Sequence, residues 1–112
     1  MTAYAVAIIH ETRLGPEIRR YLELIDETLK PYSGCYRIHG GPYETVEGDW
    51  RGDLVIIEFP DLDQARAWYQ SDNYQAIKSL RVGNTRGELF LVDGVPDGHR
   101  GIDILQPRMA AR

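Results

Sequence analysis

A single carboxylate, Glu58, follows an apolar run that otherwise has the composition of a buried strand. The run covers residues 54–57, and Pro60 ends the segment two residues after the carboxylate. Alternate residues of an extended strand share a face, so Glu58 is expected to lie beside Leu54 and Ile56 among core residues. Removing an ionised carboxylate from water costs several kcal/mol unless it is paired. Glu58 is therefore predicted to have a basic partner or a raised pKa.

The segment CYRIH, residues 35–39, supplies two candidate partners. The turn-rich stretch GDWRGD separates it from residues 54–59, so the two segments are predicted to pair as an antiparallel hairpin. Simple alternation puts Cys35, Arg37 and His39 on one face, within reach of Glu58. A pair of Glu58 with His39 or Arg37 would suit an acid–base site. The alternatives are a structural ion pair and a carboxylate that accepts backbone N–H groups.

Aromatic side chains and one arginine are the candidates for ligand binding. Trp68 lies in a predicted helix and is expected in the core, whereas Trp50 lies in a loop and is a better candidate for a pocket wall. A core or dimer contact is the alternative for Trp50. Tyr74 and Arg81 lie one to two helical turns apart and could offer a hydroxyl group and a cation to an acidic ligand. The alternative for Arg81 is an ordinary surface position.

Other chemistries lack a signal in the sequence. His10, His39 and His99 are far apart and show no metal-ligand spacing, so no metal site is predicted. Cys35 has no catalytic context and is expected to be a small buried residue. No G-x-G-x-x-G or Walker pattern occurs, and no cofactor is predicted.

Composition bounds the class of protein. A chain of 112 residues with 43% hydrophobic and 27% charged residues is long enough for one domain with one core. The net charge of −4 and the scattered basic residues argue against nucleic-acid binding. The apolar run at residues 3–9 is too short to span a bilayer and has no basic leader. With only one cysteine, which suits a reducing compartment, a cytoplasmic protein is expected.

Periodicity predicts four strands and two helical regions. The strands are expected at residues 4–9, 35–39, 54–59 and 88–92, and the second could resume at residues 43–46. A helix is expected from Pro16, and a second from a D-x-x-Q capping box at Asp61, with an interruption at Ser71. The order β-α-β-β-α-β is that of an α+β, ferredoxin-like sandwich. Strands 4–9 and 54–59 are apolar on both faces.

The last residues fall outside this unit. The domain is expected to cover residues 1–95, and residues 96–112 are expected to form a C-terminal tail. Ile102, Ile104 and Leu105 in this tail could dock on a partner subunit.

Three stretches resemble a known family: SGCYRIHGGPYETVEGDW, VIIEFPDLDQARAWYQSDNYQAIKSLR and GELFLVDG. They are similar to the domain-of-unknown-function 1330 family, whose small proteins belong to the dimeric α+β barrel superfamily. The resemblance covers about residues 3 to 95. Two positions depart from the family pattern, because His39 stands where arginine is frequent and Gly15 where aspartate is frequent.

The resemblance implies a homodimer in which helices cover one face of each sheet and the partner's sheet covers the other. Related barrels include monooxygenases, isomerases and decarboxylase-like proteins that work without a bound metal. By that analogy Glu58 and His39 would transfer a proton, while the substrate would be held by Tyr36, Arg37, Trp50 and Tyr74. The implied function is a cofactor-independent enzyme acting on a small acidic or aromatic metabolite in a cleft between sheet and helices. A non-catalytic ligand-binding module and a purely structural dimer are the alternatives.

Overall fold

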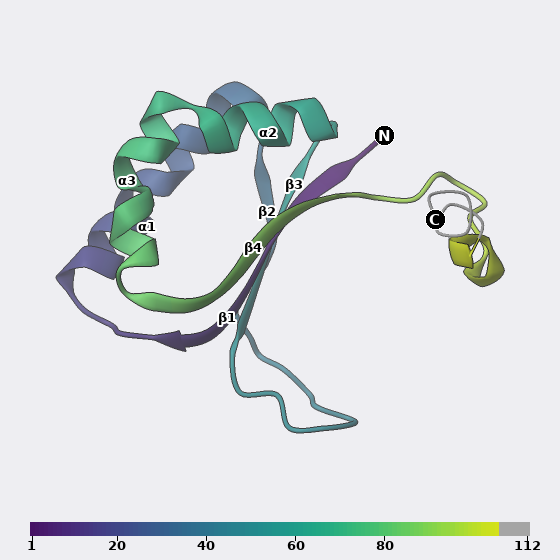
Figure 1. Ribbon diagram of the computed structural model, residues 1–112, viewed down its shortest axis with the longest axis horizontal. Coiled ribbons are helices and arrows are strands. Elements are labelled where there is room, and N and C mark those ends of the chain that lie inside the picture. Colours follow the sequence, from purple (N-terminus) through teal and green to yellow (C-terminus); the bar gives the residue numbers. More distant parts are fainter. Residues whose placement is uncertain (106–112) are drawn as a thin grey trace.

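The structure is a computed structural model that describes residues 1–105. One layer is a sheet of four strands, β1 (Ala3–Thr12), β2 (Cys35–His39), β3 (Asp53–Phe59) and β4 (Thr85–Asp93). The other layer contains α1 (Pro16–Leu29), the short 3-10 helix η1 (Lys30–Tyr32), α2 (Leu62–Gln70) and α3 (Asp72–Val82), all on one side of the sheet (Figure 1). A second 3-10 helix, η2 (Gly101–Ile104), follows β4. This order confirms the predicted ferredoxin-like β-α-β-β-α-β fold.

The sheet is antiparallel throughout, with the strand order β2-β3-β1-β4. Ala5 of β1 pairs with Ile57 of β3 and Leu91 of β4, and these side chains face the helices. The next residue, Val6, pairs with Ile56 and Phe90 on the opposite face. The two edge strands, β2 and β4, therefore lie on opposite sides of the central pair.

The core lies between the sheet and the helices. In α1, buried Ile18, Tyr21, Ile25 and Leu29 recur at three- and four-residue spacing and form one apolar stripe. The largest almost fully enclosed side chains are Phe59, Trp68 and Tyr74.

Local signals explain where the second helical region begins and breaks. Asp61 is the N-cap of α2 and accepts a hydrogen bond from the backbone N–H of Gln64 at 2.8 Å, as the capping-box pattern predicts. Ser71 has an extended conformation that ends α2, and its hydroxyl oxygen accepts from the backbone N–H of Tyr74 at the start of α3. The predicted interruption at Ser71 is thus confirmed.

The strands differ from their predicted bounds mainly at one end of the sheet. β1 continues to Thr12 and β4 begins at Thr85, three residues before the predicted start. A bulge between Ile9 and Glu11 shifts the register, after which Glu11 pairs with Arg86 and Thr12 with Thr85. Ladder pairing therefore extends both strands through polar residues that lack an alternating pattern.

The second face of the sheet is not covered by any helix within residues 1–105. It carries Tyr4, Val6 and Ile8 of β1, and Phe90 and Val92 of β4. The side chains of Phe90 and Val92 are 44% and 42% exposed. We call this surface the open face. Its composition confirms that the central strands are apolar on both faces.

Two segments extend from the sheet. Residues 40–52 form a long loop that reaches beyond the end of the sheet (Figure 1), and the possible strand at residues 43–46 is not formed. After Asp93 the chain leaves the sheet, and η2 stands apart from the helix layer (Figure 1). Residues 106–112 of the predicted tail lie outside the described residues. Within the described part of the chain, no helix is both long and apolar enough to cross a membrane.

Candidate functional site

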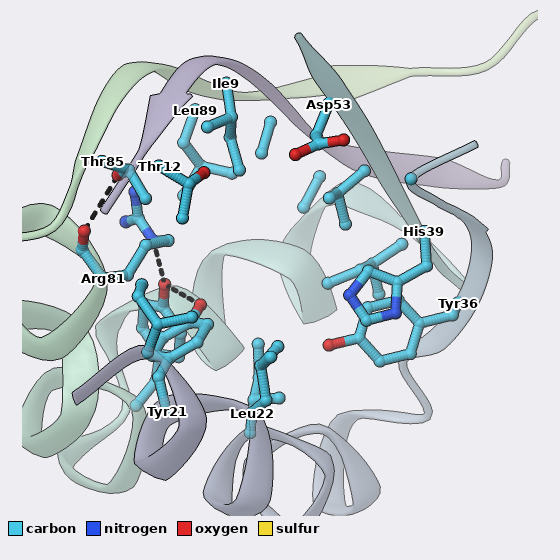
Figure 2. A pocket seen from close by; sticks show the side chains of 18 of the residues that line it. Ile9, Thr12, Tyr21, Leu22, Tyr36, His39, Asp53, Arg81, Thr85 and Leu89 are labelled. Atoms are coloured by element: carbon cyan, nitrogen blue, oxygen red, sulfur yellow. Dashed lines mark hydrogen bonds between the residues drawn. The ribbon is translucent and has the colours of Figure 1, made fainter. Parts of the chain in front are cut away.

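A cavity of about 260 Å³ lies between the helix layer and the sheet (Figure 2). Its floor is formed by inward-facing residues of the sheet, including Ala5 and Ala7 of β1. These small side chains leave space that larger residues would fill. Leu14 and Leu22 also border the cavity and are 82% and 46% exposed, so the cavity reaches the surface beside them.

One end of the cavity contains a network of two phenols and a guanidinium. The hydroxyl oxygens of Tyr21 and Tyr74 are 2.8 Å apart, and Arg81 Nε donates to the Tyr74 oxygen at 3.2 Å (Figure 2). Burial raises the pKa of Tyr21 well above its ordinary value, which keeps this phenol neutral. The end thus carries neutral hydroxyl groups next to a cation.

Arg81 is half-buried and forms no ion pair with a carboxylate of residues 1–105. Burial by itself lowers the pKa of Arg81, but the Tyr74 and Tyr21 hydroxyls act in the opposite direction and the net pKa is raised. The guanidinium therefore stays charged while it faces a largely apolar cavity.

The other end of the cavity carries a stacked pair of rings. Tyr36 and His39 of β2 have ring centroids 4.4 Å apart and an interplanar angle of 12°. Burial raises the pKa of Tyr36 to about 12. Asp53, at the start of β3, also lines the cavity near this pair (Figure 2). His39 belongs to the edge strand β2, whereas Arg81 lies near the end of α3 beside Thr85 of the other edge strand, β4. The two side chains therefore lie on opposite sides of the cavity (Figure 2).

A bulge in β2 decides which side chains face the cavity. Tyr36 pairs with Ile57 and His39 with Val55, so both residues face the helices, and Arg37 is the extra residue between the two ladder segments. The prediction that Cys35, Arg37 and His39 share one face is therefore wrong. One inserted residue reverses the alternation for everything that follows it.

Glu58 lies on the open face and does not line the cavity. Its carboxylate accepts two hydrogen bonds from Arg37, Nε to Oε1 and Nη2 to Oε2, both at 3.2 Å. These hydrogen bonds to Glu58 are the main reason why the pKa of Arg37 is raised above its ordinary value. The structure thus brings Glu58 together with Arg37, one of its two predicted partners, and not with His39.

Two other residues, Trp50 and Cys35, do not lie where the sequence predicted, and neither lines the cavity. Trp50 is 37% exposed in the 40–52 loop, where its ring packs edge-on against Tyr43 at a centroid distance of 6.2 Å. The Tyr43 hydroxyl in turn accepts from the backbone N–H of Leu54 at 2.6 Å. Cys35 is exposed on the open face rather than buried, because its ladder partner is Glu58.

Four of the predicted site residues line the cavity, namely Tyr36, His39, Tyr74 and Arg81. Tyr21, Thr12 and Asp53 line it too, but the sequence pattern did not single them out. Tyr21 belongs to the apolar stripe of α1, and only its approach to Tyr74 shows that its hydroxyl is used. Among residues 1–105, no three His, Cys, Asp or Glu side chains come together as metal ligands would.

Solved structures of the same fold come from several organisms. A protein of unknown function from Rhodopseudomonas palustris has a TM-score of 0.65 and 13% sequence identity, over 85% of this chain and 83% of its own. A dimeric ferredoxin-like protein of unknown function from Jannaschia has a TM-score of 0.60 and 20% identity, over 86% of this chain and 100% of its own. SnoaB, a cofactor-independent oxygenase from Streptomyces nogalater, has a TM-score of 0.53 and 12% identity, over 88% and 96%. At these identities the likeness shows the fold alone.

No curated protein sequence matches the chain. The family model described as "Domain of unknown function (DUF1330)" matches residues 2–95, which is the whole sheet and helix layer. The chain therefore belongs to the DUF1330 family.

Proposed function

We propose that the protein is a cofactor-independent enzyme that uses acid–base chemistry on a small acidic or aromatic metabolite in the cavity between sheet and helices. The observation that carries this proposal is the cavity itself. It is largely apolar, but it presents an imidazole at one end and a charged guanidinium with two phenols at the other. An apolar pocket on which a small number of polar groups converge is typical of small-molecule binding sites.

His39 is the proton-transfer group in this proposal. Imidazole can both accept and donate a proton near neutral pH. Its stacking on Tyr36 holds the ring plane, and Tyr74 and Arg81 hold the substrate at the far end. Glu58 and Arg37, which were candidates for the same chemistry, form an ion pair on the open face, and we assign them to sheet packing. Trp50 is assigned to the structure of its loop.

We further infer that the protein forms a homodimer through the open face. The support is an apolar sheet surface that no helix of the described residues covers. The Jannaschia protein of the same fold is described as dimeric. In such a dimer the Glu58–Arg37 pair would be enclosed between two sheets.

SnoaB shows that this fold can support oxygenase chemistry without a cofactor. This analogy favours a cofactor-independent enzyme but does not identify a reaction, since one fold carries many functions. A non-catalytic ligand-binding protein is the second candidate, because the same cavity would serve it.

The test combines a ligand screen with three variants. Small acidic and aromatic compounds that raise the melting temperature of the wild type are assayed for turnover. His39→Gln is expected to abolish turnover and keep binding, whereas Glu58→Gln on the open face is expected to change neither. Ala7→Leu, which fills the cavity floor, is expected to remove binding. Binding that survives Ala7→Leu would contradict the proposed site, and binding without turnover in the wild type would favour the second candidate.

A further inference from the structure

Arg81 is the candidate anchor for a ligand, because it is half-buried and has no carboxylate partner within residues 1–105, unlike several exposed arginines. Arg37, Arg66 and Arg86, for example, each lie within 3.4 Å of a carboxylate oxygen on the surface. Arg81 is more buried than these three, yet it forms no ion pair within residues 1–105. A half-buried charge without a counter-ion is costly unless a ligand supplies one.

The donor geometry at Arg81 fits a carboxylate. Its Nε–H is used by the Tyr74 oxygen, which leaves the N–H groups of the two terminal nitrogens for a ligand. These groups match a carboxylate that binds with both oxygens. The Tyr74 bond, together with the packing of α3 against α1, fixes the direction of the guanidinium. Thr12 and Thr85 lie beside it at the same end of the cavity (Figure 2).

The walls and the volume limit the rest of the ligand. Between the two polar ends, the cavity is lined by apolar side chains such as Ala5, Ile25 and Val55. A sugar or a polyanion would leave its polar groups unpaired against these walls. A cavity of about 150 Å³ holds benzene, and this cavity has about 260 Å³. By simple scaling it suits a ligand on the order of ten non-hydrogen atoms, which is a single substituted ring.

The far end disfavours a second negative charge. The Asp53 carboxylate lines that end together with the Tyr36–His39 pair (Figure 2). Two carboxylates placed close together repel each other, so an anionic group is favoured only at Arg81. A hydroxyl or amino substituent at the far end would instead find hydrogen-bond partners.

We propose that the cavity binds a single-ring monocarboxylate, with its carboxylate on Arg81 and its opposite edge toward Tyr36 and His39. This inference rests on the proposed function, because it uses the same cavity, and it adds the charge, size and orientation of the ligand. Bound in this way, the ligand presents the ring edge opposite its carboxylate to the imidazole.

Benzoate and benzamide are the probes, because they have nearly the same shape and differ in charge. Calorimetry on the wild type is expected to show tighter binding of benzoate by roughly 10- to 100-fold, the value of a charge-assisted hydrogen-bonded pair. Arg81→Gln is expected to remove this preference and leave benzamide binding unchanged. Arg81→Lys should keep part of the preference, because it keeps the charge but loses the two-nitrogen geometry.

Arg86→Gln is the matched control, since Arg86 is an exposed arginine at the start of β4, and it is expected to keep the wild-type preference. Equal binding of benzoate and benzamide to the wild type would overturn the carboxylate inference and leave the cavity as a ligand site. A preference that persists in Arg81→Gln or disappears in Arg86→Gln would overturn the assignment to Arg81. If neither probe binds the wild type, both this inference and the proposed site fail.

Discussion

A buried hydroxyl group connects two helices of the core, α1 and α2. Trp68 Nε1–H donates to Thr28 Oγ1 at 2.9 Å, and the Thr28 hydroxyl donates to the backbone oxygen of Ile25 at 2.7 Å. Thr28 is 5% exposed and Trp68 is 1% exposed. No buried side-chain nitrogen or oxygen of the described residues lacks a hydrogen-bond partner. Each buried polar side-chain atom of the described core is therefore paired, as is usual in folded proteins.

Thr28→Val is expected to lower the free energy of unfolding by about 1–3 kcal/mol, because it leaves the indole N–H of Trp68 buried without an acceptor. Thr45→Val, in the exposed 40–52 loop, is the matched control and is expected to change stability by less than about 0.5 kcal/mol. Urea unfolding followed by tryptophan fluorescence measures both. Equal effects of the two variants would show that the hydrogen bond contributes nothing.

Alkaline pH should destabilise the fold through Tyr36. Burial raises its pKa from 10.0 to about 12, so between these values the unfolded chain loses a proton that the folded chain keeps. Stability contributed by the neutral phenol is therefore complete below pH 10 and falls as the pH rises toward about 12. Tyr36→Phe is expected to reduce the slope of melting temperature against pH in this window. An unchanged slope would mean that Tyr36 ionises as it does in the unfolded chain.

Among the elements, short helices and one bulged strand position the site. α3 carries both Tyr74 and Arg81, and its start depends on the Ser71 turn that separates it from α2. β2 places Tyr36 and His39 toward the cavity only because its bulge lies at Arg37. Local capping and one inserted residue thus set the directions of four site side chains.

Asp61→Ala is expected to lower the free energy of unfolding by about 1 kcal/mol, because it removes the acceptor that caps α2. Asp61→Asn keeps a capping oxygen and is expected to retain nearly full stability. Chemical denaturation of the three proteins side by side measures the difference. The cap would be unimportant if Ala and Asn at this position gave the same stability.

Truncation after Gly94 is expected to leave a cooperative thermal unfolding transition. The Gly94 N–H donates to the backbone oxygen of Thr2 at 2.7 Å, and none of residues 95–105 is buried. The core should therefore not depend on the segment that follows. Circular dichroism of the truncated chain tests this, and a chain without folded signal would refute it.

At the scale of the whole molecule, the two faces of the sheet have different roles. The helix face holds the core and the cavity, while the open face is apolar in its centre and carries the His10–Glu88 hydrogen bond and the Arg37–Glu58 ion pair. A surface with an apolar centre and polar pairs around it is suited to a protein–protein interface. Binding of a second copy and binding of a ligand would then use opposite faces.

Phe90→Glu is expected to convert a dimer into a monomer, because it places a charge in the apolar centre of the open face. Val82→Glu, at the exposed end of α3 in the helix layer, is the control and is expected to leave the dimer intact. Analytical ultracentrifugation at micromolar concentration distinguishes the two states. A wild type that sediments as a monomer would contradict the proposed dimer.

The sequence by itself determined the order of the elements and most of their limits. Alternation marked the strands, three- and four-residue spacing marked α1, and the polar residues Asp61 and Ser71 marked where α2 begins and where it breaks. These signals are local, since each depends on residues within a few positions of one another. Tyr74 and Arg81 were also within reach of this reasoning, because they lie on one helix.

Only the tertiary structure decided which face each polar side chain uses. The bulge at Arg37 sends His39 into the cavity and leaves Arg37 with Glu58 on the open face, although strict alternation predicts one common face. A strand has a period of two residues, so one inserted residue exchanges the faces of everything beyond it. Whether it is inserted depends on hydrogen bonds to β3, which lies far along the chain. The contact between the hydroxyl groups of Tyr21 and Tyr74 is also decided by the tertiary structure. These residues are 53 positions apart, and the packing of α1 against α3 brings them together, whereas no pattern within either helix predicts it.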